Sequence, residues 1–298
     1  MTTTRGVFLR RIFLERGAEM VDKRFFLPLT ALLGGAAAFV LRLLQDKTGF
    51  EAETGLPVRG NLAGLSLIVL LAGLAVVFWF LGRKLPPEDP EAPPEFPTDF
   101  SSGNTALLSV TVGGVALMAL SGLADLAEGL GVMPEGLAVY SRHSLYSILR
   151  EGGLGFSPQG QILAGILILA SSSALFLAAA VCRKREEQRP FPAAALLPPG
   201  AALVVRLVFS YRVASVNPSL EMYYPELLAL VFMTLAYYRL SSFAFQSGDT
   251  RRFSLYACLA FVFSCTALAD GSVYLSALLI LAGGALSLLG FLLLRLSN

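Results

Sequence analysis

The amino-acid sequence predicts an all-α, polytopic helical membrane protein with about eight transmembrane helices. Of its 298 residues, 55% are hydrophobic and only 15% are charged, and the mean hydropathy is +0.67. That composition is unlike a soluble domain of this length. Apolar stretches of about 20 residues, the length that crosses a bilayer, recur along the chain. Because these stretches are continuously apolar rather than alternating, they predict helices and not the strands of a barrel.

The apolar stretches place eight spans in chain order. Their expected bounds are 25–45, 62–82, 105–125, 162–182, 191–211, 225–245, 253–270 and 274–295. The hydrophilic blocks between them stay under about 40 residues, so we expect no catalytic domain outside the membrane.

The distribution of Lys and Arg predicts the orientation. With the N-terminus in the cytoplasm, fifteen basic residues lie on the cytoplasmic side and five on the opposite side, as the positive-inside rule requires. We therefore expect a multi-pass protein of the cell (plasma) membrane with both termini cytoplasmic. The net charge of +2 follows from this topology and gives no indication of nucleic-acid binding.

Residues 1–24 form a basic N-terminal segment on the cytoplasmic side. Phe8, Leu9, Ile12 and Phe13 recur at helical spacing among arginines, which is typical of an amphipathic helix at a membrane surface. A simple basic retention signal explains the same residues. The segment lacks the apolar core and cleavage site of a signal peptide.

Two stretches indicate an internal duplication. "ALLGGAAAFVLRL" at 31–43 and "ALLPPGAALVVRL" at 195–207 are identical at eight of thirteen positions, including Arg42 and Arg206. Alanine and leucine match easily between spans. An arginine inside a span costs about 3 kcal/mol and is rare, so this match carries more weight.

Further matches extend the duplication. "SGLAD" at 121–125 and "TALAD" at 266–270 close the third and seventh spans, so that Asp125 matches Asp270. The chain then consists of two four-helix membrane units, 25–186 and 187–298. An even number of spans makes the units parallel repeats, related by an axis along the membrane normal. The alternative is a chance alignment of Ala- and Leu-rich helices.

Proline and glycine pairs stand at corresponding positions of the two units. Pro198 and Pro199 remove two backbone donors and predict a break in the fifth span, and their counterparts are Gly34 and Gly35. Matched helix breaks indicate a site near the middle of a transporter. A glycine pair also lets neighbouring helices approach closely, which is the alternative. Pro199 would suit the start of a helix, but the repeat argues against that start, because the corresponding stretch 25–33 is too apolar to lie outside the bilayer.

Four charged residues form the candidate binding or pathway site. Arg42, Asp125, Arg206 and Asp270 all fall near the outer boundary of the membrane. An aspartate at a helix C-terminus opposes the helix dipole and needs a cationic partner, and the repeat favours Arg42 with Asp125 and Arg206 with Asp270. Such pairs are either structural or part of a polar vestibule. Other residues at this level are Glu128, Arg212, Glu221, Tyr223, Tyr224, Glu226 and Tyr274.

Arg239 is a fifth candidate, in the inner half of the sixth span. It stands beside Tyr237 and Tyr238 without an obvious carboxylate partner. It would attract an anion or extend toward the headgroups. The proline-rich, acidic stretch 85–100 is expected to be an extended, solvated linker.

Known catalytic motifs are absent from the sequence. It holds neither HExxH nor GxSxG, and one histidine and three scattered cysteines make no metal or redox motif. We therefore assign no catalytic residue, metal or cofactor. The favoured class is a transporter or channel for a small solute or ion with a polar site between the halves. A non-transporting scaffold, sensor or assembly factor is the alternative, and an intramembrane enzyme the weakest of the three. The expected partners are the lipid bilayer and the solute or ion.

Overall fold

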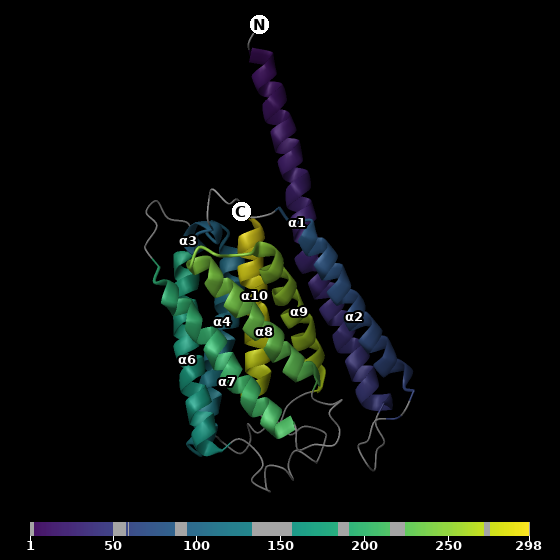
Figure 1. Ribbon diagram of the computed structural model, residues 1–298, viewed down its shortest axis with the longest axis vertical. Helices are drawn as coiled ribbons and strands as arrows, with labels where there is room; N and C mark the ends of the chain where they lie inside the picture. The colour runs from purple at the N-terminus through teal and green to yellow at the C-terminus, as the bar shows by residue number, and fades with distance from the viewer. Residues whose placement is uncertain are drawn as a thin grey trace.

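A computed structural model describes residues 3–49, 58, 60–86, 94–132, 157–183, 191–214, 224–270 and 275–297. In this part of the chain the structure is a bundle of helices without a β-strand (Figure 1). The elements are α1 (Thr3–Thr48), α2 (Leu62–Arg83), α3 (Phe96–Asp99), α4 (Thr105–Gly129), α6 (Pro158–Val181), the 3-10 turn η2 (Ala193–Leu196), α7 (Leu197–Ala214), α8 (Tyr224–Ala244), α9 (Thr250–Asp270) and α10 (Leu275–Ser297).

Eight segments of the described chain are long and apolar enough to cross a membrane. They agree with the expected spans to within a few residues, which confirms the all-α, polytopic class. Side-chain caps explain several of the boundaries. Asn61, Asn104 and Ser157 each accept a hydrogen bond from a backbone N–H in the first turn of α2, α4 and α6, which satisfies donors that the helix itself leaves open.

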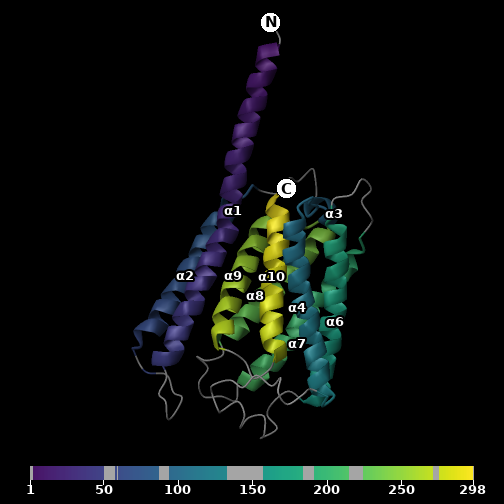
Figure 2. The same cartoon turned by 180° about the vertical axis from the view of Figure 1, so that it is seen from behind.

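The helices α9 and α10 lie in the middle of the bundle. Helix α10 packs against α4 and α9, and α9 packs against α1, α2 and α8, an order that Figure 2 shows from behind. Of the eight spans α10 and α9 are the most deeply enclosed, at 72% and 67% buried, whereas α2 is 22% buried. The proximal end of the bundle is the one where α10 ends, and the distal end is the one where α4 and α9 end (Figure 1).

Glycine allows α4 and α10 to approach backbone to backbone. A Cβ at Gly114 would collide with the backbone of Ser287, and one at Gly283 would stand 2.6 Å from Met118 N. Small residues at such contacts bring transmembrane helices close enough for extensive van der Waals packing.

The predicted break at the glycine pair is wrong. Helix α1 runs without interruption through Gly34 and Gly35. A Cβ at Gly34 would stand 2.7 Å from the Leu74 side chain, and one at Gly35 would stand 3.0 Å from the Phe261 ring and 3.1 Å from Cys265 Sγ. The pair therefore serves the close approach of α2 and α9 to α1.

The proline pair stands at a helix start. The 3-10 turn η2 ends at Leu196, and α7 begins at Leu197 with Pro198 and Pro199 in its first turn. There the missing N–H groups cost no intrahelical hydrogen bond. The expected break inside the fifth span is thus a junction between a 3-10 turn and an α-helix, and the prolines begin the helix rather than interrupt it.

Part of the predicted solvated linker is buried. Phe96 and Phe100 are 1% and 0% exposed, Leu85 is also buried, and residues 96–99 form α3. The expectation of an extended, solvated segment is therefore wrong for both described ends of 85–100. Residues 87–93 of the linker lie outside the described part of the chain.

Candidate functional site

Two arginine–aspartate ion pairs form at the distal end of the bundle. Arg42 Nε of α1 lies 2.5 Å from Asp270 Oδ1 of α9. Arg206 Nη1 of α7 lies 2.8 Å and 2.9 Å from Oδ2 and Oδ1 of Asp125 on α4. The four residues that the sequence indicated are therefore paired with one another. The expected partners are wrong: each arginine binds the aspartate of the other proposed half.

Both pairs are shielded from solvent. Arg42, Arg206 and Asp125 are only 1%, 2% and 2% exposed, and the Asp270 side chain is 19% exposed. A buried charge without a partner is very costly, so each guanidinium depends on its carboxylate and on further hydrogen bonds.

The Arg206 guanidinium reaches a second helix. Its Nη2 donates to Ser276 Oγ at 3.1 Å, and Ser121 Oγ donates to the backbone carbonyl of Ser276 at 2.7 Å. Ser276 stands in the first turn of α10. Arg206 thus joins α7 to both α4 and α10.

The surroundings of Arg42 differ from those of Arg206. Arg42 Nη1 donates to Gln45 Oε1 of the same helix at 2.8 Å, and the guanidinium lies 5.7 Å from the centroid of the Tyr224 ring. Gln45 is three residues from Arg42 and so shares its face of α1. The sequence could have indicated it by that spacing.

Glu226 lies within electrostatic range of both ion pairs. It accepts a hydrogen bond from Ser210 Oγ at 3.2 Å, and its carboxylate is attracted by Arg206 and repelled by Asp270. Asp46 also acts on Asp270. We call these six groups the charge cluster: Arg42, Asp46, Asp125, Arg206, Glu226 and Asp270. The sequence placed Glu226 at this level, but it gave no signal for Ser210 or Ser276.

Arg239 lies apart from the charge cluster. It follows Glu226 by thirteen residues on α8, which is about 20 Å along a helix. Arg239 is partly buried, and its guanidinium lies 5.6 Å from the Tyr238 ring centroid. The structure therefore assigns Arg239 to the proximal half of the bundle. Glu221, Tyr223 and Tyr274, which the sequence placed beside the cluster, are outside the described residues.

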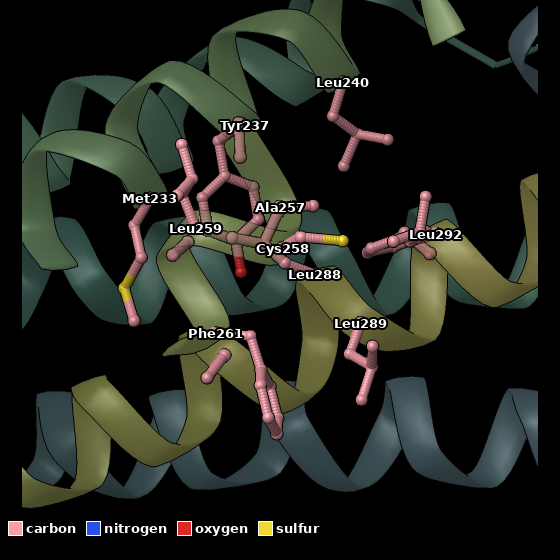
Figure 3. Close-up of a cluster of buried hydrophobic side chains, with 14 of the residues drawn as sticks. Met233, Tyr237, Leu240, Ala257, Cys258, Leu259, Phe261, Leu288, Leu289 and Leu292 are labelled. Atoms are coloured by element: carbon pink, nitrogen blue, oxygen red, sulfur yellow. The ribbon is translucent and has the colours of Figure 1, made fainter. Parts of the chain in front are cut away.

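Between the two ends, the centre of the bundle is packed with apolar side chains around one polar contact. Figure 3 shows Tyr237 among Met233, Cys258 and Leu288, between α8, α9 and α10. The Tyr237 hydroxyl lies 2.6 Å from Ser287 Oγ and 3.2 Å from Met118 Sδ. Ser287 Oγ can also donate to Gly283 O at 2.8 Å, so these buried hydroxyls are satisfied.

A second charged contact lies at the proximal end. Arg295 Nη1 of α10 lies 3.2 Å from Asp99 Oδ1 of α3, and Arg295 Nε donates to Thr250 Oγ1 of α9 at 2.9 Å. Neither Asp99 nor Arg295 was singled out as a site residue by the sequence. Asp99 was not predicted because it belongs to a segment whose composition indicated a solvated linker.

The fold and these contacts define a class, the helical multi-pass integral membrane proteins. Comparison of the chain with protein-family models, with curated proteins and with solved structures found no match. Within the described residues, no group of three or more His, Cys, Asp and Glu side chains is placed to hold a metal ion.

Proposed function

We propose that the protein is a transporter or channel, with a pathway for a small solute or ion between two four-helix halves, 25–186 and 187–298. The observation that carries this proposal is the exchange of partners in the ion pairs. One pair joins α1 of the first half to α9 of the second, and the other joins α7 of the second half to α4 of the first.

This exchange is compatible with a parallel repeat, as pairs within each half would also have been. If α7 corresponds to α1 and α9 to α4, interchanging the halves converts one ion pair into the other. The four helices also run in the same direction through the bundle (Figure 1), as repeats related by an axis along the membrane normal require. The symmetry of the two ion pairs supports the repeat. The packing does not follow the same interchange, since α1 packs against α9 whereas its counterpart α7 packs against α6 and α8.

Ion pairs between two halves suit a gate at the distal end. Removing one partner of a buried pair costs about 3–5 kcal/mol, so the halves separate only when each charge finds another partner. Glu226 supplies one, because it already interacts with Arg206. A permeating solute or water would be the new partner of the remaining charges. Each charged group would then change its partner when the gate opens and would not be left unpaired.

The orientation is part of the proposal. We infer that both termini are cytoplasmic and that the protein resides in the cell membrane. The basic residues of the sequence support this topology, and the described chain starts and finishes toward the same end of the bundle (Figure 1). Terminal reporter fusions that are active only in the cytoplasm would test it, and a signal from only one terminus would contradict it.

Solute flux tests the transport proposal directly. Purified protein is reconstituted into liposomes, and fluxes of protons, alkali cations, halides and amino acids are compared with empty liposomes. We expect flux of one class with the wild type and an altered rate with Arg206→Gln, which removes the charge that holds α7 to α4. Arg252→Gln is the matched control, because the Arg252 side chain is 61% exposed and forms its ion pair with the neighbouring Asp249.

A second candidate is a non-transporting scaffold or sensor. It is favoured by the hydrogen-bonding of both buried guanidiniums to carboxylate and amide or hydroxyl partners, which is the pattern of a structural tie. In that case folded wild-type protein carries no flux above empty liposomes. Arg206→Gln then lowers thermal stability and has no other effect.

A further inference from the structure

Six phenylalanine rings close the proximal end of the bundle. We call them the aromatic cluster: Phe96, Phe100, Phe191, Phe243, Phe253 and Phe291. The Phe100 ring centroid lies 5.1 Å from that of Phe243, 6.1 Å from that of Phe253 and 6.3 Å from that of Phe291. The Phe96 ring lies 4.9 Å from Phe100 and 5.2 Å from Phe191. These separations are in the range of favourable aromatic contacts.

Five of the six rings come from two kinds of element, and Phe191 stands just before η2. Phe243, Phe253 and Phe291 belong to the spans α8, α9 and α10. Phe96 and Phe100 instead belong to α3 and its C-terminal cap, in the connection between α2 and α4. This connection inserts both of its phenylalanines completely among the spans.

The connection crosses the proximal end of the bundle. Helix α2 ends at Arg83 and α4 begins at Thr105, and the two helices have different neighbours: α2 packs against α1 and α9, and α4 packs against α6 and α10. The chain therefore passes over the end of the bundle between them, and α3 lies on this path (Figure 1).

A partly exposed ion pair, between Asp99 and Arg295, holds the edge of α3. The Arg295 and Asp99 side chains are 15% and 24% exposed, unlike the buried arginines of the distal end. Directly after α3, Ser102 N donates to Cys182 O at 2.8 Å, which holds the segment on the α6 side. An ion pair at a partly exposed position exchanges with water at much lower cost than a buried one.

The residues beneath α3 lead toward the centre of the membrane. Cys258 follows Phe253 by five residues on α9, about 7.5 Å deeper, and is fully buried. It lies near Tyr237 and Leu288 (Figure 3), and we expect displacement of α3 and Phe100 to make it more accessible from the proximal end.

We propose that α3 and Phe100 form a removable plug that closes the proximal end of the pathway, with the Asp99–Arg295 ion pair as its latch. The proposal rests on the proposed transport function. Helices α9 and α10 also contact the charge cluster at their other ends, through Asp270 and Ser276. Helices α9 and α10 therefore contact both the charge cluster at the distal end and the plug at the proximal end.

Accessibility of Cys258 tests the plug without a transported solute. The full chain, with Cys182→Ala and Cys265→Ala so that only Cys258 can react, is placed in nanodiscs and treated with a membrane-impermeant maleimide. We expect Asp99→Asn and the double variant Phe96→Ala/Phe100→Ala to label about tenfold faster than this parent, because the rate follows the population of the open form. Phe245→Ala is the matched control, since Phe245 lies near the same end but is 51% exposed, and it should label at the parent rate.

A second cysteine distinguishes local opening at α3 from loosening of the whole bundle. The corresponding chain that retains only Cys265, in the distal half of α9, should label at an unchanged rate in the same variants. Equal acceleration at Cys258 and Cys265 would mean that the variants loosen the whole bundle, and parent-rate labelling of Cys258 would mean that α3 does not open. Either result overturns the plug. Faster labelling of Cys258 alone, together with absence of any flux, would support the plug and contradict transport.

Discussion

Arg206 on α7 binds both carboxylate oxygens of Asp125 on α4, at 2.8 Å and 2.9 Å. The two residues are 81 positions apart and belong to different proposed halves. This contact and its counterpart, Arg42 with Asp270, set the order in which the helices surround the charge cluster. Their energetics can be tested independently of any function.

The exchange of ion-pair partners predicts which charge reversal restores stability. Arg42→Asp should lower the free energy of unfolding by about 3–5 kcal/mol, because it leaves Asp270 partly buried beside a like charge. Adding Asp270→Arg should recover most of the loss, whereas adding Asp125→Arg should lower stability further. Thermal unfolding in the same detergent measures all three variants. Recovery with Asp125→Arg instead would contradict the pairing described here.

The contact of α4 with α10 predicts unequal effects at two neighbouring glycines. Gly114→Ala should destabilise the protein by about 1–3 kcal/mol, because the added methyl group forces the α4 and α10 backbones apart. Gly113→Ala is the control: a Cβ there meets nothing within 4 Å, and its stability should be close to that of the wild type. Chemical unfolding in mixed micelles distinguishes the two. Equal stabilities of the two variants would contradict the close approach of α4 and α10, because helix propensity alone favours alanine at both positions.

The buried hydroxyl of Tyr237 should contribute only a small amount to the free energy of unfolding. Tyr237→Phe removes the contact with Ser287 Oγ, but Ser287 keeps its hydrogen bond to Gly283 O. We expect a loss of about 0.6 kcal/mol, typical of hydrogen bonds between transmembrane helices. The reference variant is Tyr238→Phe, because Tyr238 is 59% exposed and its change should be undetectable. A loss of several kcal/mol at Tyr237 would indicate that its hydroxyl orders more of the bundle than these contacts show.

The level of a residue along the bundle could be predicted from the sequence, but its lateral neighbours could not. Counting residues from the start of each span placed Arg42, Asp125, Arg206 and Asp270 at one level, because a helix rises by a fixed distance per residue. Nothing in that count says which helix lies beside which. The most economical pairing within each half was therefore chosen, and it is the pairing that the structure contradicts.

Average composition gave a wrong prediction for segments whose structure depends on one or two residues. The stretch 85–100 is rich in proline and acidic residues, and its average predicted solvation. Phe96 and Phe100 nevertheless find an aromatic environment that spans distant in sequence provide. In the same way, Gly34 and Gly35 are compatible with a break and with close packing, and only the position of Leu74 and Phe261 against α1 decides between them.

The enclosure of α9 and α10 constrains how the protein is made. These helices are translated after the other six described spans, yet they lie in the middle of the bundle and are its most deeply buried spans. Until they are inserted, α1, α4 and α8 lack the helices that they pack against, so native packing is completed only when α9 and α10 enter. A chain whose translation stops before residue 250 lacks Asp270, the ion-pair partner of Arg42, and Ser276, a hydrogen-bond partner of Arg206, and membrane quality control would be expected to degrade it.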